Sequence, residues 1–100
     1  MPENPYKMYE SFDPQLIGGV NNIRDLAMTD GALPRKFKLL IAMVLDATNG
    51  ASNGVRNLAN EAIKAGATKQ EIAEALRVAE YICGVGCIHT AAAGLSDLLK

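Results

Sequence analysis

GATKQEIAEALRVAEYICGVG, residues 66–86, carries the clearest fold signal in this chain. Thr68 and Glu71 form a capping box, in which each side chain satisfies a backbone N–H group at a helix start. Apolar residues then recur every three or four positions, as on one face of a helix: Ile72, Leu76, Ala79 and Cys83. Gly84 and Gly86 loosen or end this helix. The stretch therefore predicts an amphipathic helix with both of its ends marked.

The segment before this stretch contains a helix without a polar side. PRKFKLLIAMVLDAT, residues 34–48, begins with proline, which favours the first position of a helix. Every residue between Lys38 and Asp46 is apolar, so no face of the helix is marked for water. A 100-residue bundle can hardly enclose one helix completely. We therefore expect part of this helix to lie in an interface between copies of the chain.

The N-terminal part combines an arm with an amphipathic helix. Residues 1–12 contain two prolines and three of the five aromatic residues, and we expect them to form an irregular arm. Asp13 then provides an N-cap and Pro14 a first helical residue. One apolar face follows at helical spacing: Leu16, Val20, Ile23 and Ala27.

Two shorter segments complete the expected helices. Residues 55–65 form a helix that Gly66 stops at its C-terminal end. Residues 89–100 form a last helix, whose small side chains permit close packing against a neighbour. Because no segment alternates as a strand does, the sequence predicts one all-α domain of about five helices over residues 13–100.

Composition excludes several classes of function. The chain has 100 residues and a net charge of −1, and its basic residues are scattered, so nucleic-acid binding has no support. The longest apolar run, residues 39–45, is too short to span a bilayer, and no signal peptide is visible. Two cysteines do not make a disulfide framework. We expect a cytoplasmic protein with reduced thiols.

The stretch CGVGCIH, residues 83–89, holds both cysteines and the single histidine. Three interpretations stay open: buried packing, a redox-active dithiol, and a metal site formed by Cys83, Cys87 and His89. On a continuous helix the two cysteines would be neighbours, since residues four apart share a face. Glu80, three residues before the first cysteine, is a candidate proton shuttle, and His89 is a second one.

Residues 30–51 and 66–86 together resemble the carboxymuconolactone decarboxylase/alkylhydroperoxidase (AhpD)-like family, and the resemblance extends from about residue 13 to residue 99. Its most specific piece is GAT-x-x-EIAEAL-x-VAEY-x-x-G. The resemblance implies an all-helical protomer that assembles with itself into trimers or hexamers. This agrees with the interface expected from the apolar helix of residues 34–48.

The resemblance also locates the thiol relay of the family's peroxidase-like members, which consists of Glu, Cys-x-x-Cys and His. Alignment by the flanking helices places the glutamate at Leu39, the cysteines at Ala51 and Gly54, and the histidine at Leu58. All four relay residues are therefore missing from these positions. The decarboxylase members carry Glu-x-Arg-x-His at the start of this helix, and here only Arg56 remains.

The sequence therefore supports three functional hypotheses. The first is a thiol-dependent oxidoreductase, of peroxidase or disulfide-reductase type, that uses Cys83 and Cys87 with an external thiol reductant and no bound cofactor. The second is a decarboxylase-like enzyme in which Arg56 binds a small acidic substrate. Asp46 could line the same pocket, pair with Arg56 or cap the Asn-Gly turn, and capping is favoured. The third is a structural or partner-binding member without chemistry.

Overall fold

The computed structural model describes residues 6–99, which contain six α-helices and no strand. The helices are α1 (Lys7–Phe12), α2 (Pro14–Met28), α3 (Arg35–Thr48), α4 (Ser52–Lys64), α5 (Lys69–Cys83) and α6 (Val85–Leu95). The all-α prediction is confirmed. There is one helix more than expected because residues 7–12 are helical rather than irregular; residues 1–5 of the expected arm lie outside the described part.

The helix ends follow the capping residues. At α5 the Thr68 hydroxyl accepts a hydrogen bond from the Glu71 N–H (3.0 Å), and the Glu71 carboxylate accepts one from the Thr68 N–H (2.9 Å). At α2 the Asp13 carboxylate accepts from the Leu16 N–H at 3.1 Å, next to Pro14 in the first turn. These predicted caps are therefore confirmed.

Two predicted boundaries are wrong, and both errors involve helix starts. The helix expected over residues 55–65 already begins at Ser52. The last helix runs from Val85 to Leu95 instead of over residues 89–100. Gly84, whose φ of +91° favours glycine, ends α5 and caps α6 at once, so no loop separates the two helices.

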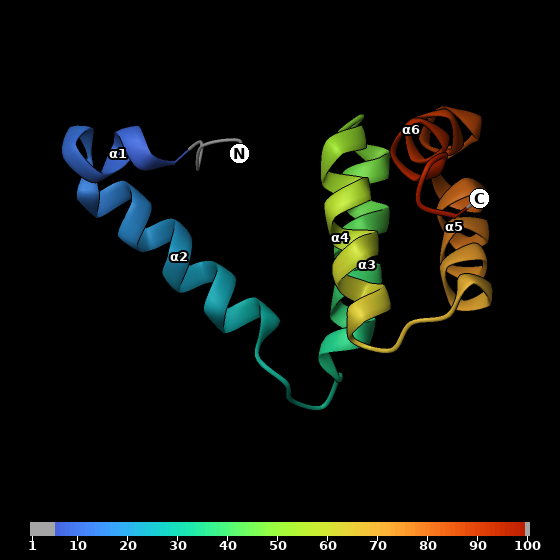
Figure 1. Ribbon diagram of the computed structural model, residues 1–100, viewed down its shortest axis with the longest axis horizontal. Helices are drawn as coiled ribbons and strands as arrows, with labels where there is room; N and C mark the ends of the chain where they lie inside the picture. The colour runs from blue at the N-terminus through green and yellow to red at the C-terminus, as the bar shows by residue number, and fades with distance from the viewer. Residues whose placement is uncertain (1–5, 100) are drawn as a thin grey trace.

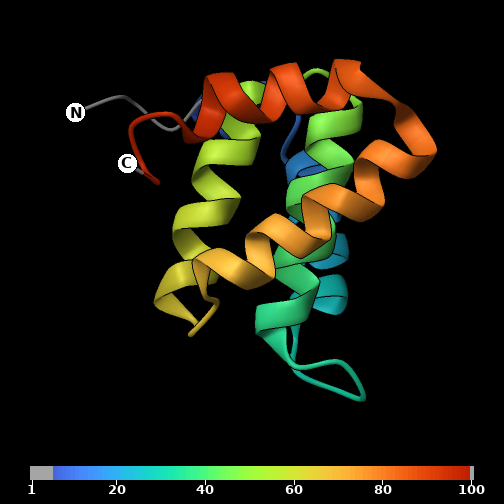
Figure 2. The same ribbon diagram turned by 90° about the vertical axis from the view of Figure 1, so that its right-hand side faces the viewer.

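Helices α3 to α6 pack around one core. α3 contacts α4, α5 and α6, and α6 also crosses α4 and α5. Seen from the side, α5 and α6 cover one face of the α3–α4 pair, and α1–α2 lies on the other side (Figure 2). The largest fully buried side chains come from four helices: Leu39, Met43, Val55, Ile72 and Cys87.

Contact between α4 and α6 depends on a glycine. A Cβ atom at Gly94 would overlap the backbone carbonyl oxygen of Ser52 and lie 3.2 Å from the Arg56 nitrogen. These are backbone atoms that cannot rotate away, so only glycine allows this approach. The predicted close packing of small residues in the last helix is therefore observed here. An ion pair between Lys36 and Glu71 (3.0 Å) adds a link between α3 and α5.

Helices α1 and α2, together called the α1–α2 arm from here on, stand apart from this core (Figure 1). Neither helix contains a buried residue. They contact each other, and α2 makes few contacts with α3. In the arm, the Tyr9 and Phe12 rings pack at a centroid distance of 6.1 Å. No helix within residues 6–99 has the length and apolar character needed to cross a membrane.

Candidate functional site: two thiols at the junction of α5 and α6

The junction at Gly84 brings the two cysteines together without a continuous helix. Cys83 is the last residue of α5 and is exposed, whereas Cys87 lies in the first turn of α6 and is 1% exposed. The Cys87 thiol donates a hydrogen bond to the Gly84 carbonyl at 3.1 Å. Both thiols are free. Within one chain, Cys87 is therefore buried in the core as the packing interpretation expects, whereas Cys83 is not.

Cys83 affects the ionisation of the Cys87 thiol. Burial raises the pKa of the Cys87 thiol, and a side-chain hydrogen bond with Cys83 raises it further. The charge of a Cys83 thiolate and that of Glu80 act in the same direction, because a negative neighbour disfavours a second thiolate. Cys87 therefore gives up its proton less readily than a free thiol, and Cys83 is the thiol that solvent reaches.

Glu80 lies three residues before Cys83 on α5, and its charge also raises the pKa of the Cys87 thiol. It lines a hollow of about 440 Å³ between α5 and α6, together with Leu76, Arg77 and Ile88. The Glu80 side chain is exposed. An exposed carboxylate therefore borders this largely apolar groove.

His89 is not brought into this arrangement. It is exposed, and it follows Cys87 by two positions on α6, which corresponds to about 200° around the helix. Within residues 6–99 no group of three or more His, Cys, Asp or Glu side chains could hold a metal ion. Within the described part of one chain, Cys83, Cys87 and His89 therefore do not form such a group.

The positions of the family relay are filled by packing. Leu39 is buried in the core and Leu58 packs against it, while Ala51 is the N-cap of α4. At Gly54 a Cβ atom would lie 2.8 Å from the Asp46 Cγ atom, so the aspartate occupies the space of a side chain there. A cysteine at this position would displace Asp46 as well as replace a glycine.

The two residues proposed to bind substrate, Arg56 and Asp46, do not meet as an ion pair. Arg56 donates to the Asp97 carboxylate at 3.5 Å, and both side chains are exposed. The Asn-Gly turn is closed by the Asp46 backbone carbonyl, which accepts from the Ala51 N–H at 2.9 Å. We expected the Asp46 side chain to cap this turn, but the hydrogen bond that closes it comes from the Asp46 main chain.

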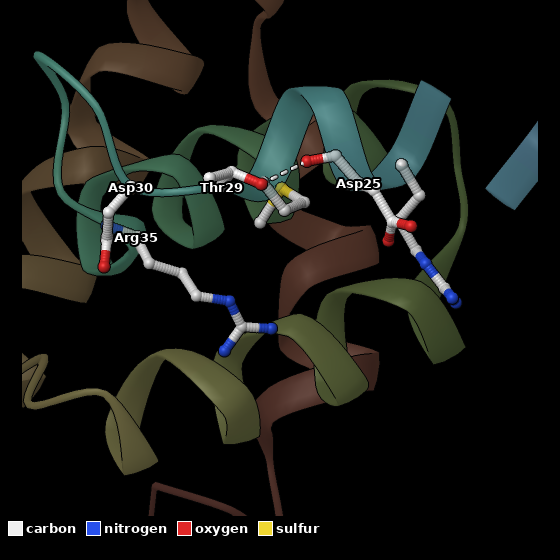
Figure 3. Close-up of a pocket in the computed structure, with 6 residues that line it drawn as sticks. Asp25, Thr29, Asp30 and Arg35 are labelled. Atoms are coloured by element: carbon white, nitrogen blue, oxygen red, sulfur yellow. Dashed lines mark hydrogen bonds between the residues drawn. The ribbon is translucent and has the colours of Figure 1, made fainter. Parts of the chain in front are cut away.

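A further hollow, which the sequence did not reveal, lies where α2 meets α3 and measures about 550 Å³ (Figure 3). Its walls carry opposite charges: Arg24, Asp25, Asp30 and Arg35. The Asp30 carboxylate accepts from the backbone N–H of Arg35 at 2.5 Å. The four hollows described in the structure include neither cysteine, nor Arg56, nor Asp46.

The described residues thus form a small all-α domain with two thiols at a helix junction. The sequence profile of the carboxymuconolactone decarboxylase family matches residues 14–97, and this chain belongs to that family. The fold is similar to the crystal structure of a carboxymuconolactone decarboxylase family protein from Legionella pneumophila, in its apo form. The two share 30% identity and a TM-score of 0.82, over 90% of this chain and 80% of the other. A comparison with curated proteins returns no significant match.

Proposed function

We propose that this protein is a thiol-dependent oxidoreductase whose working residues are Cys83 and Cys87. The observation that carries the proposal is that the Gly84 junction joins an exposed thiol, Cys83, to a buried thiol, Cys87, four residues later. A redox-active dithiol needs one thiol that the substrate can reach and a second, shielded thiol that converts the sulfenic acid of the first into a disulfide. The family's relay positions hold no cysteine, and these two are the only cysteines in the chain.

The proposed cycle assigns a different step to each cysteine. The Cys83 thiolate attacks one oxygen of a peroxide ROOH, the O–O bond breaks, and Cys83 becomes a sulfenic acid while the departing RO⁻ takes a proton from water and leaves as ROH. The Cys87 thiol then attacks the Cys83 sulfur, which forms the disulfide and releases water. Glu80 accepts the proton of Cys87 in this step and passes it to the departing oxygen. An external dithiol reduces the disulfide by exchange and is itself oxidised to a disulfide.

This cycle fits a reducing compartment, because each turn ends with an external reductant returning both thiols to their free form. We therefore propose a cytoplasmic location and a small thiol or dithiol protein as the reductant. His89 has no part in the proposed cycle, since it lies on another side of α6.

Alkylation and mass spectrometry test the proposal. Under native conditions one thiol, Cys83, should react with a maleimide, and both should react after unfolding. After one equivalent of hydrogen peroxide, neither thiol should react, and the intact mass should fall by two hydrogen atoms. If both thiols remain alkylatable in the unfolded protein after peroxide, the redox proposal fails.

Single substitutions separate the two roles. In Cys87→Ser the sulfenic acid at Cys83 should persist and be trapped by dimedone, whereas Cys83→Ser should give no trapped product. Glu80→Gln should keep the first step but slow disulfide formation, by about 10- to 100-fold for the loss of one proton-transfer group. Equal peroxide turnover by wild type and Cys83→Ser would exclude the assignment.

We also propose that the chain assembles with copies of itself. Ile41 and Leu45 of α3 are exposed in a single chain, although the helix that carries them is apolar on all sides between Lys38 and Asp46. Light scattering on a size-exclusion column should therefore give a mass of more than one chain. A single-chain mass at every concentration would contradict this part of the proposal and leave the redox part intact.

A further inference from the structure

α2 presents an apolar face that nothing in its own chain covers. None of its fifteen residues is buried. The α2 face, defined here as Leu16, Val20, Ile23 and Ala27, points into solvent. An isolated helix of this length is marginal in water and takes most of its stability from packing of its apolar side. A well-formed α2 therefore requires a partner surface.

The arm is held at its angle by specific bonds rather than left loose. The Thr29 hydroxyl donates to the Asp25 carbonyl at 2.6 Å, which seals the end of α2 (Figure 3). The Lys38 ammonium donates to the Thr29 carbonyl. The Asp30 carboxylate accepts from the first N–H of α3, that of Arg35. These bonds tie α2 to the start of α3 and present the α2 face outward.

α3 carries a second uncovered surface on the same side of the molecule. The α3 stripe, defined as Phe37, Ile41 and Leu45, repeats every four residues and is exposed. Its buried residues, such as Leu39 and Met43, point the other way, toward α4, α5 and α6. α5 and α6 lie on the side of the α3–α4 pair opposite to α1 and α2 (Figures 1 and 2). Because the stripe faces away from the α3 residues buried against α5 and α6, we place it on the side of the arm.

We propose that the α2 face of one copy packs on the α3 stripe of a second copy, and that the exchange is reciprocal. This inference rests on the proposed self-association and names its surfaces. With both surfaces on one side of the protomer, a single two-fold contact buries both at once. Docking of α2 on the α5–α6 corner would leave the stripe uncovered and would seal Cys83 from its substrate.

The available area matches this assignment. The six largest side chains of the two surfaces are between 42% and 66% exposed: Leu16, Val20, Ile23, Phe37, Ile41 and Leu45. At about 100 Å² for one fully exposed aliphatic side chain, they contribute roughly 300 Å² per copy. Since interfaces are roughly 57% apolar, each copy would bury about 500 Å² in all. The pair then reaches the ~1,000 Å² expected of a specific interface.

Disulfide trapping between differently marked copies tests the pairing. Both native cysteines are replaced by serine, and Val20→Cys and Ile41→Cys are introduced into separate preparations. After mixing and mild oxidation, a cross-linked dimer containing one copy of each variant should dominate. Asn22→Cys, on the polar side of α2, is the matched control and should give little cross-link with Ile41→Cys.

The alternatives give distinct products. If Val20→Cys cross-links only with itself, α2 pairs with α2 and the inference is overturned. If the mass is that of several copies but no mixed dimer forms, the pairing fails while self-association stands. A single-chain mass overturns both. In each case the redox assay on the native cysteines is unaffected, so failure of the thiol proposal is recognised separately.

Charge substitution provides an independent measure. Ile23→Glu should weaken association by at least about tenfold, which corresponds to about 1.4 kcal/mol. Asn22→Glu adds the same charge on the other side of α2 and should have little effect. Because Asn22 and Ile23 are exposed in their own chain, both variants should keep the helical circular dichroism of α3 to α6. Equal association by the two variants would overturn the inference.

Discussion

Leu39 in α3 and Leu26 in α2 are the same side chain in the same secondary structure, yet the first is 2% exposed and the second 78%. The difference arises from what surrounds each helix. α3 is covered by three other helices, whereas α2 meets α1 and only the start of α3. The sequence marked both as helices, α2 by the Asp13 cap and its apolar spacing, and α3 by Pro34 and its continuous apolar run. Burial depended on neighbours that the arm lacks within one chain.

The largest effect should come from shortening these two leucines. Leu39→Ala leaves a cavity in the core and should lower the free energy of unfolding by about 2–5 kcal/mol. Leu26→Ala removes the same atoms from a solvated position and should change it by less than about 0.5 kcal/mol. Urea unfolding at low protein concentration measures both. Similar losses of unfolding free energy in the two variants would show that Leu26 is packed as closely as Leu39, which contradicts its exposure in the structure.

A second pair of variants compares glycines. Gly94→Ala forces α6 away from the Ser52 carbonyl and should cost about 1–3 kcal/mol. At Gly19 in α2, nothing lies within 4 Å of an added Cβ atom. Gly19→Ala should therefore raise local helix stability by about 0.5–1 kcal/mol. Thermal unfolding should show a lower midpoint for Gly94→Ala and no decrease in the midpoint for Gly19→Ala. A reversed order would refute the proposed role of Gly94.

The caps should act globally in the core and locally in the arm. Thr68→Ala removes one half of the α5 capping box and should lower the free energy of unfolding by about 1 kcal/mol. Asp13→Ala removes the α2 cap and should instead speed hydrogen exchange of α2 amides without changing the global midpoint. Exchange measured by mass spectrometry distinguishes the two results. Global destabilisation by Asp13→Ala would show that the arm and the core unfold together.

The smallest expected effect is on the pH dependence of stability, through the ion pair between Lys36 of α3 and Glu71 of α5. The backbone hydrogen bond from Thr68 and the Lys36 ammonium hold the pKa of Glu71 below its ordinary value of 4.5. A carboxylate with a lowered pKa in the folded state contributes stability above its unfolded pKa and loses it as pH falls further. Glu71→Gln should therefore reduce stability near neutral pH and flatten its decline below about pH 4.5. If the stability of Glu71→Gln declines below pH 4.5 as steeply as that of the wild type, Glu71 does not contribute to the acid sensitivity of the fold.

The thiol site shows where sequence reasoning succeeded and where it stopped. The spacing of Cys83 and Cys87 indicated neighbours on a continuous helix, and in the structure Cys83 raises the pKa of Cys87 across the junction of two helices. The apolar periodicity of α5 placed Cys83 on the apolar face, yet Cys83 is exposed and Cys87 is the buried one of the two. Which thiol faces solvent depended on the turn at Gly84 and on α6 folding back over the core.

Local chemistry in the sequence was sufficient for the all-α class, the capping box at Thr68, the cap at Asp13 and the stop at Gly66. Each of these depends on groups within a few residues, so the linear pattern contains the whole interaction. Tertiary structure alone decided that α2 would leave the core, that Asp46 would fill the space at Gly54, and that Cys83 would stay exposed. These outcomes depend on helices brought together from distant parts of the chain, and periodicity identifies an apolar face without identifying what covers it.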